Sequence, residues 1–325
     1  MKTFAFALLI SSSLSISAFA NGEIQKARFE PWLKVIEKSL DKKNSKEAAE
    51  ALLEGENRVA AFNLQALGKL YAPQNEKFNS LIRKSFQELE DGIGDYDKWR
   101  DIAAKSGDKG DEKAEEKAQE TLAQNLENDH WVGKKNNRMD EIRDFLDQNN
   151  WYDFNYDKQV VLTQLIHQLD SLNKTKYDLT RLEKKGKKGD DGNGLHELKR
   201  EIRWFTIEAR ILNGLVQFED PQTCSVPKYA SLIQTDAAKS KYATLPDGEK
   251  DSNPCRIEQC LFVKLATSID ALDKLKSASE QDKKSRESDT VIPKLQPQAQ
   301  AIYKELQDSK IFSRLSNNIR QCLSH

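Results

Sequence analysis

The sequence has few of the residues that break helices and no excess of charge of either sign. Its 325 residues include only 14 glycines and 8 prolines. The 51 lysines and arginines nearly balance the 52 aspartates and glutamates, leaving a formal net charge of -1. This balance excludes a general attraction to nucleic acid or anionic lipid, so we expect no specific nucleic-acid recognition. Any anion site has to be a local patch.

Long apolar runs are missing after the first twenty residues, so no membrane span is expected in the rest of the chain. The opening stretch MKTFAFALLISSSLSISAFA combines one lysine, an apolar run and small residues at Ala18 and Ala20. This pattern is typical of a secretory signal peptide. We therefore predict cleavage near Ala20 and an exported protein, either periplasmic or secreted.

The composition favours helices over strands. Charged residues make up 32% and hydrophobic residues 38% of the chain, which is typical of long, salt-bridged helices. Apolar residues recur at helical spacing in eight segments: Ile24–Leu40, Ser45–Tyr71, Phe78–Ala104, Met139–Leu146, Asp157–Leu182, His196–Phe218, Cys255–Ser279 and Gln298–Leu323. Polar residues 105–117 predict a loop or a frayed helix start. The sequence thus predicts an all-α helical bundle.

The domain organisation predicted from the sequence has two helical halves. Residues 1–20 form the signal peptide, 21–183 the N-terminal half, and 195–325 the C-terminal half with the cysteines. The stretch KKGKKGDDGNG at 184–194 is typical of a mobile, solvated linker. A weak internal repeat, LEDGIGDYDKW against LATSIDALDKL, suggests that the halves are similar. It aligns Leu89 with Leu265, Ile93 with Ile269, Asp97 with Asp273 and Lys98 with Lys274.

Four cysteines lie in the last third of the chain: Cys224, Cys255, Cys260 and Cys322. An even number of cysteines in an exported protein predicts two disulfides. Cys255 and Cys260 are too close in an expected helix to pair with each other. Two pairings remain open: Cys224 with Cys255 and Cys260 with Cys322, or Cys224 with Cys260 and Cys255 with Cys322. A zinc site is the alternative, but the CxxC spacing is absent, so no metal is predicted.

One helix, GLHELKREIRWFTIEARILNGL from Gly194, gathers cations on one face. At about 100° per residue, one stripe is apolar: Leu195, Leu198, Ile202, Phe205, Ala209, Leu212 and Val216. A second face carries the basic residues His196, Lys199, Arg200, Arg203 and Arg210. Glu197, Glu201 and Glu208 lie on a third face. Charges separated in this way leave the basic face available for an outside partner.

Two interpretations of this basic face are open. It can bind a chain of anionic groups, such as a phosphate polymer, with added backbone donors at the helix start by Gly194 and Leu195. Alternatively, it pairs with acidic residues of a neighbouring helix. Acids available for that pairing are Glu50, Glu54, Glu56, Glu88, Glu90, Asp91 and Asp95.

The His196 helix followed by residues 265–275 resembles the conserved histidine α-helical domain (CHAD) family, and RKSFQELEDGIGDYDKW at 83–99 is similar to the corresponding segment of the first half. The resemblance implies a bundle of two similar halves whose basic helices bind inorganic polyphosphate. It assigns anion contacts to His196, Lys199, Arg200 and Arg203, with Arg58 and Lys69 in the first half. The first half departs from the pattern, with Glu54 near the histidine position and Asn63 and Gln65 where cations are expected.

Signals for catalysis are absent from the sequence. GxSxG and P-loop motifs are missing, no cofactor is implied, and the carboxylate pairs Glu90/Asp91 and Asp95/Asp97 are unremarkable among so many acids. His167 is expected to be packed or at a rim, and His130 has no evident partner. The aromatic group Trp151, Tyr152, Phe154 and Tyr156 suggests a capping loop, or else a platform for a sugar or peptide. We predict a non-catalytic, exported module that binds polyphosphate or another polyanion. The alternative is a helical protein that binds a protein partner.

Overall fold

The structure is a computed structural model whose described residues form eleven α-helices and one two-stranded sheet, which confirms the predicted all-α class. It describes residues 10–133, 137–149, 154–177, 179, 194–221, 223–247, 253–284 and 288–324, without the side chains of 10–24, 105, 154–155, 276–284 and 288–294. The chain divides into two compact units, Met1–Val160 and Val161–His325. This division lies inside a helix, whereas the sequence placed it at 184–194, of which only Gly194 is among the described residues.

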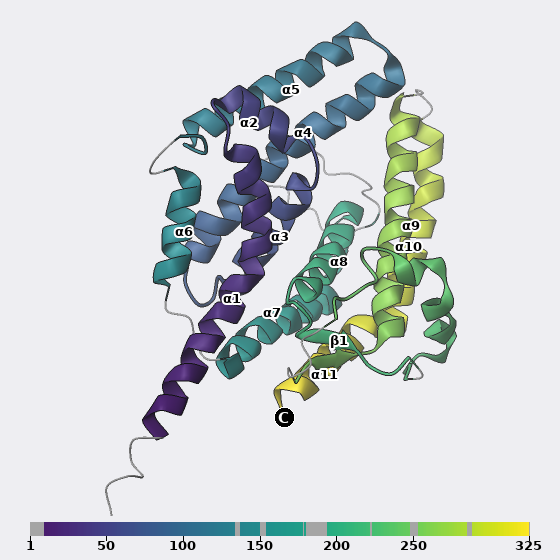
Figure 1. Ribbon diagram of the computed structural model, residues 1–325. Helices are drawn as coiled ribbons and strands as arrows, with labels where there is room; N and C mark the ends of the chain where they lie inside the picture. The colour runs from purple at the N-terminus through teal and green to yellow at the C-terminus, as the bar shows by residue number, and fades with distance from the viewer. Residues whose placement is uncertain are drawn as a thin grey trace, which may run out of the picture. The chain divides into compact units, whose positions relative to one another are not determined.

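Among its described residues, the first unit is built from six α-helices, one π-helix and the start of a further α-helix. They are α1 (Ile10–Leu40), α2 (Ser45–Leu52), α3 (Asn57–Tyr71), the π-helix η1 (Phe78–Arg83), α4 (Lys84–Ser106), α5 (Lys109–Asn128), α6 (Arg138–Gln148) and the first residues of α7 (Phe154–Lys174). Helix α1 packs against α2 and α3, while α4 and α5 lie side by side as a long hairpin (Figure 1). The core contains Phe29, Leu33, Ile36, Leu64, Leu67, Phe78, Phe86, Leu89 and Ile93.

Two glycines allow unusually close helix contacts in this unit. A Cβ atom at Gly68 of α3 would lie 2.8 Å from the carbonyl oxygen of Phe78, so the backbones of α3 and η1 touch directly. A Cβ atom at Gly92 of α4 would lie 2.9 Å from Cδ1 of Leu122 on α5. The neighbours of Gly68 are backbone atoms, so a larger residue there would push α3 and η1 apart. At Gly92 the neighbour is the end of the Leu122 side chain, which marks a close contact of α4 with α5.

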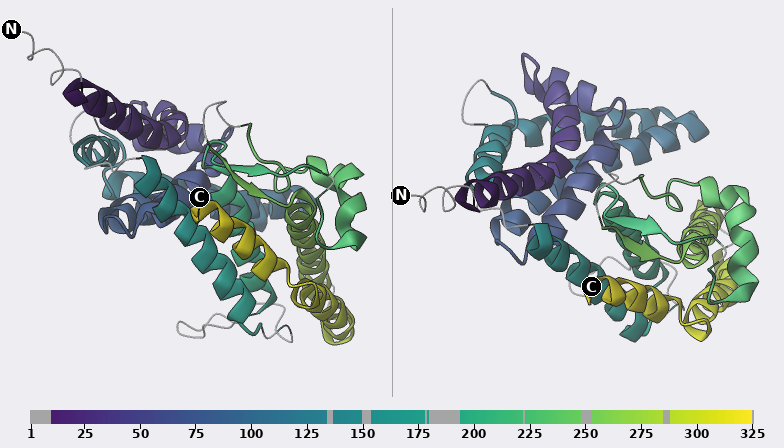
Figure 2. Two further views of the ribbon diagram at one scale, coloured as in Figure 1. Left: turned by 90° about the horizontal axis from the view of Figure 1, so that it is seen from below. Right: turned by 60° about the horizontal axis from the view of Figure 1, so that its bottom comes forward.

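The second unit contains the rest of α7 and four further helices. These are α8 (Leu195–Arg210), α9 (Gln259–Lys284), α10 (Ser288–Asp308) and α11 (Ile311–Leu323). Strands β1 (Val216–Phe218) and β2 (Cys255–Ile257) pair in parallel, with Val216 opposite Cys255. Two 3₁₀-helices, η2 (Pro227–Gln234) and η3 (Asp236–Lys239), lie against α9 (Figure 2). They bring Leu232 and Ala238 onto Val263 and Ala266.

Both disulfides are formed, and they follow the second of the two pairings left open by the sequence. Cys224 pairs with Cys260 across a Cα–Cα distance of 6.0 Å, and Cys255 pairs with Cys322 across 5.2 Å. The expected helix over Cys255–Ser279 begins only at Gln259, because Cys255 lies in β2. The first disulfide joins the segment before η2 to the start of α9. The second joins β2 to the last turn of α11.

Several predicted helices are broken or shifted, and residues with left-handed backbone mark three of the breaks. The expected helix Ser45–Tyr71 is two helices, separated near Gly55 with φ of 68°. The expected helix His196–Phe218 ends at Arg210, because Asn213 (φ 48°) and Gly214 (φ 80°) turn the chain into β1. Lys310, with φ of 52°, separates α10 from α11. The left-handed conformation is incompatible with continuing a helix.

Of the two expectations for 105–117, the loop is wrong and a helix start is present, since α5 already begins at Lys109. Gly107 ends α4 in the left-handed conformation, and the Asp108 side chain caps α5 by accepting a hydrogen bond from the backbone N–H of Gly110 at 2.7 Å. Asp111 and Glu112 in the first turn favour a helix start electrostatically. The connection between α4 and α5 is therefore only two residues long.

Among the described helices, none combines the length and apolarity that crossing a bilayer requires. Helix α1 runs without a break from Ile10 to Leu40 and includes Pro31. The predicted signal peptide falls on residues whose side chains lie outside the described part of the chain. Its cleavage stays a prediction.

A buried ion pair connects the first and last helices of the first unit. Nη1 of Arg28 on α1 donates a hydrogen bond to Oδ2 of Asp157 on α7 at 2.8 Å and another to the Tyr71 hydroxyl. The side chains of Arg28 and Asp157 are 1% and 0% exposed. Burial lowers the pKa of Arg28, but the contacts with Tyr71 and Asp157 outweigh it, so the pKa is raised. The guanidinium therefore stays charged inside the protein.

We expect Arg28→Met to lower the free energy of unfolding by about 3–5 kcal/mol, because it leaves the Asp157 carboxylate buried without a cation. The double variant R28M/D157L should recover most of this loss, since it removes both charges. Urea unfolding followed by circular dichroism measures both. Lys239→Ala, which removes a fully surface-exposed pair with Asp236, is the control and should leave stability nearly unchanged. A double variant no more stable than R28M would contradict the assignment.

Candidate functional site

The apolar stripe predicted for α8 is confirmed. Leu198, Ile202 and Phe205 are fully buried, and α8 packs against α9 through this face. The helix start is also covered, because Gly194 and Leu195 are both buried. The backbone donors expected there to support an anion site are therefore not open to solvent.

Lys199, at the centre of the predicted basic face, is buried rather than exposed. Its ammonium group forms an ion pair with Oδ1 of Asp273 on α9, and its side chain is only 9% exposed. Asp273 itself is 45% exposed. A bound polyanion would have to displace this carboxylate and then reach a covered cation. The contact therefore favours the structural interpretation of Lys199.

The other cations of α8 are engaged as well. The Arg200 guanidinium pairs with Glu197 at 2.7 Å and with Glu201 at 3.9 Å, both on the same helix. Arg210 donates a hydrogen bond to the backbone carbonyl of Lys241, and burial lowers the pKa of Arg210. His196 and Arg203, both half-buried, also interact with other groups of the protein. The acidic and basic faces predicted for α8 are therefore not independent, because Arg200 pairs with acids of the other face.

In the first unit, Arg58 on α3 is held by two acids of α4. Its guanidinium lies 2.9 Å from Oε1 of Glu90 and 3.1 Å from Oδ2 of Asp97. Gly94 makes this possible, because a Cβ atom there would lie 2.8 Å from Nη2 of Arg58. Burial lowers the pKa of Arg58, yet its contacts with Glu90 and Asp97 raise it overall. Arg58 therefore links α3 to α4.

The two first-half positions where cations were expected face the core. Asn63 and Gln65 are 1% and 5% exposed, and the Gln65 side-chain amide donates to the Phe86 carbonyl oxygen at 3.1 Å. Cations at these positions would have to be buried. Lys69 is half-buried and also interacts within the protein.

The internal repeat aligns two acids that play the same part in their units. Asp97 on α4 pairs with Arg58 on α3, and Asp273 on α9 pairs with Lys199 on α8. Each unit thus has a basic residue on one helix bonded to the aligned acid of the next. The sequence analysis singled out both acids and both cations, but it did not predict that they pair with one another.

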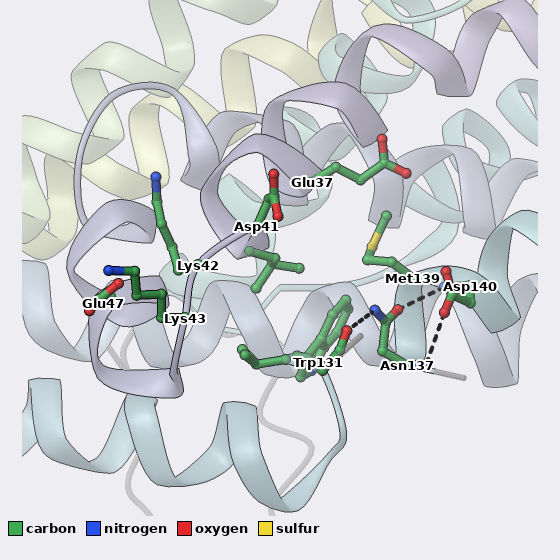
Figure 3. Close-up of a pocket in the computed structure, with 12 residues that line it drawn as sticks. Glu37, Asp41, Lys42, Lys43, Glu47, Trp131, Asn137, Met139 and Asp140 are labelled. Carbon is green, nitrogen blue, oxygen red and sulfur yellow. Dashed lines mark hydrogen bonds between the residues drawn. The ribbon is translucent and has the colours of Figure 1, made fainter. Parts of the chain in front are cut away.

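A groove of about 1000 Å³ that the sequence did not reveal lies in the first unit (Figure 3). It is lined by the end of α1, the start of α2, the turn after α5 and the start of α6. The lining residues are Glu37, Leu40, Asp41, Lys42, Lys43, Glu47, Trp131, Val132, Gly133, Asn137, Met139 and Asp140. Leu40, Trp131 and Met139 are at most 7% exposed and form an apolar floor.

The walls of the groove are fixed by hydrogen bonds. His130 ends α5 in the left-handed conformation, and the Trp131 backbone N–H donates to the Leu126 carbonyl oxygen at 2.9 Å. Asn137 and Asp140 form a reciprocal capping box at the start of α6. Arg143 holds the Glu37 carboxylate with contacts of 2.6 and 2.8 Å. The groove is therefore preformed.

Unengaged charge gathers at the rim. In the part of the chain that the structure describes, no hydrogen bond or ion pair engages the side chains of Asp41, Lys42 and Lys43, all of which are exposed. Figure 3 shows Lys42 extending away from Trp131. Lys42 and Lys43 are thus available to a ligand, beside two exposed acids of the same lining, Asp41 and Glu47. This contrasts with α8, where the cations are occupied.

Among the described residues, the remaining sequence candidates are not brought together in a site. His167 is exposed on α7, as expected for a rim histidine, and Glu90 is occupied by Arg58. Trp151, Tyr152 and the side chain of Phe154 lie outside the described residues. Tyr156 is 45% exposed.

We expect Asp273→Asn to lower the free energy of unfolding by about 1–3 kcal/mol, because the buried ammonium of Lys199 loses its carboxylate. Arg200→Gln should change it by less than about 1 kcal/mol, because Arg200 is 48% exposed. Urea unfolding measures both variants. Equal effects would contradict the difference in role between the two cations.

Comparison of the chain with models of protein families, with curated proteins and with solved structures gives no match in any of the three.

Proposed function

We propose that this chain is an exported, non-catalytic helical binding protein that holds a segment of a partner protein in the groove of its first unit. The observation that carries the proposal is the contrast in charge. The cations of α8 are occupied by the protein itself, whereas Lys42 and Lys43 beside the groove are not. A binding surface needs groups that are available to a partner.

A non-catalytic role is supported by the groups that line the groove. Among its described lining residues, none is histidine, cysteine or serine. The Glu37 carboxylate is held by Arg143, and the Asp140 carboxylate accepts from the Asn137 backbone N–H. These acids are engaged in positioning the walls, which does not suit proton transfer to a substrate.

The chemistry of the groove favours a segment that combines apolar and acidic side chains. Trp131, Leu40 and Met139 offer an apolar floor for an anchoring side chain. Lys42 and Lys43 at the rim favour carboxylates next to that anchor. Because the walls are preformed, little conformational freedom has to be lost on binding.

Export and family are proposals supported by separate observations. Two disulfides are typical of an oxidising compartment, which supports export. The equivalent ion pairs at Asp97 and Asp273 support a duplicated fold of the CHAD type. Each disulfide and each of these two ion pairs lies within a single unit.

Selection from a random peptide library displayed on phage tests the groove. We expect enriched peptides to carry an aromatic or large aliphatic residue beside Asp or Glu. Fluorescence anisotropy of an enriched peptide should show affinity falling about tenfold or more in K42E/K43E, because two attractions become repulsions.

The control is K38E/K46E, which reverses two exposed neighbouring lysines that do not line the groove. It should leave the affinity of the peptide within about twofold. Equal losses in both double variants would show that only net charge matters. The proposal that the groove binds a peptide would also be refuted if no peptide were selected, or if the selected peptides bound K42E/K43E as tightly as the natural chain.

Polyanion binding is the second candidate function, and one observation favours it. Arg200 is 48% exposed, and the acids that hold it, Glu197 and Glu201, lie on its own helix. Exposed pairs of this kind contribute only about 0–1 kcal/mol, so a polyphosphate chain is able to displace them. Lys199, in contrast, would remain with Asp273.

Titration with medium-chain polyphosphate at two salt concentrations separates the two functions. Saturable binding at low salt that weakens with salt, is lost in R200E/R203E and is kept in K42E/K43E would establish the second function. Binding that is absent, or unaffected by R200E/R203E, would remove it.

A further inference from the structure

Three potential metal ligands meet where α9 begins. The sulfur atoms of Cys224 and Cys260 and a carboxylate oxygen of Glu258 all lie within 4.8 Å of one another. Glu258 and Cys260 are 6% and 1% exposed, and Cys224 is half-buried. The nearest approach of the carboxylate to sulfur is 4.0 Å, between Oε2 of Glu258 and Sγ of Cys260. The cluster is therefore shielded from solvent and compact.

Backbone groups fix the carboxylate of Glu258 in this place. Oε2 accepts a hydrogen bond from the backbone N–H of Ser225 at 2.5 Å. The Glu258 carbonyl oxygen accepts from the backbone N–H of Phe262 at 3.3 Å, which places Glu258 at the cap of α9. Ser225 directly follows Cys224, so the first of these bonds holds the Cys224 segment and the Glu258 carboxylate together at the start of α9.

The charges of this cluster change when the disulfide is reduced. In the oxidised state the carboxylate is the only charge among the three groups. In the reduced state two thiols join it, and Cys260, in the first turn of a 26-residue helix, lies where the helix start stabilises a thiolate. Two thiolates and one carboxylate in a buried space carry three negative charges. Without a metal the two cysteines remain neutral thiols, whereas a divalent cation would offset the charge of both thiolates and the carboxylate.

The distances suit zinc in particular. Zinc binds thiolate sulfur at about 2.3 Å and carboxylate oxygen at about 2.0–2.2 Å, so tetrahedral ligands lie roughly 3.3–3.8 Å apart. The Cα atoms of Cys224 and Cys260 are 6.0 Å apart, and the two bonded sulfurs have to separate to reach this spacing. Soft thiolates select zinc over magnesium or calcium.

We propose that reduction of the Cys224–Cys260 disulfide creates a zinc site formed by Cys224, Cys260 and Glu258. A dithiol reductant gives two electrons and two protons to the disulfide, whose S–S bond breaks, and becomes a disulfide itself. Zn²⁺ then displaces the two thiol protons to solvent and binds both thiolates and the Glu258 carboxylate. A water molecule completes the tetrahedron.

The second disulfide provides an internal comparison. The sulfur of Cys322 lies near the carbonyl oxygens of Asn318 and Arg256. Within the described residues, Cys255 and Cys322 belong to no group of three metal ligands. The proposal is therefore specific to Cys224 and Cys260. The sequence did not predict it, because Glu258-x-Cys260 with a distant Cys224 matches no zinc motif.

Cobalt titration tests the site, since Co²⁺ replaces zinc and reports thiolate ligands by absorption. The chain carrying C255S/C322S is reduced with dithiothreitol, freed of reductant under argon and titrated with Co²⁺. We expect one Co²⁺ per chain, with intense sulfur-to-metal charge transfer that Zn²⁺ abolishes. The same protein left oxidised should show no such absorption. Adding E258Q should weaken Co²⁺ binding about tenfold or more.

The matched control is C224S/C260S, which keeps two reducible cysteines but should show no charge-transfer band. Equal Co²⁺ binding by both cysteine variants would overturn the proposal. So would its absence in reduced C255S/C322S whose circular dichroism is native. If C255S/C322S does not fold, the reduced natural chain is compared with its E258Q variant. Equal Co²⁺ affinity of these two chains would overturn the assignment of Glu258.

Discussion

The structure depends on carboxylates that neutralise the cations which its helices bring against one another. Arg58 meets Glu90 and Asp97, and Lys199 meets Asp273, so the contacts of α3 with α4 and of α8 with α9 are polar at one edge and apolar at the centre. Burying part of a cation without such a partner would lower the free energy of unfolding. Internal pairing thus neutralises the partly buried cations among the nearly equal numbers of acidic and basic residues.

The helices could be predicted wherever burial follows from spacing alone. Leu198, Ile202 and Phe205 recur at three and four residues, and all are buried. The break at Lys310 was not predictable, because lysine rarely adopts the left-handed backbone. The break at Asn213 and Gly214 did carry a local signal, because asparagine and glycine adopt this conformation more readily than other residues. Helix α5 was missed because Leu122 and Leu126 are its only buried residues among those described. It is held by its close contact with α4 at Gly92, which no pattern within α5 contains.

The candidate site was predictable only in part, for a related reason. Helical geometry placed Lys199 and Arg200 near one face, but the acid that binds Lys199 lies 74 residues away in the sequence. Local spacing contains no information on such a partner. The groove requires α1, the turn at Trp131 and α6 to meet, and the zinc ligands require Cys224 to return to α9. Composition showed correctly that the cysteines pair, while the choice between pairings needed the position of Cys255 in β2.

The pairing of Arg28 with Asp157 also sets the order in which the first unit can become complete. The two residues are 129 positions apart, so α1 has no partner for its buried guanidinium until the beginning of α7 has been synthesised. Although α1 also packs on α2 and α3, the first unit cannot gain the stability of this ion pair until Asp157 has joined the chain.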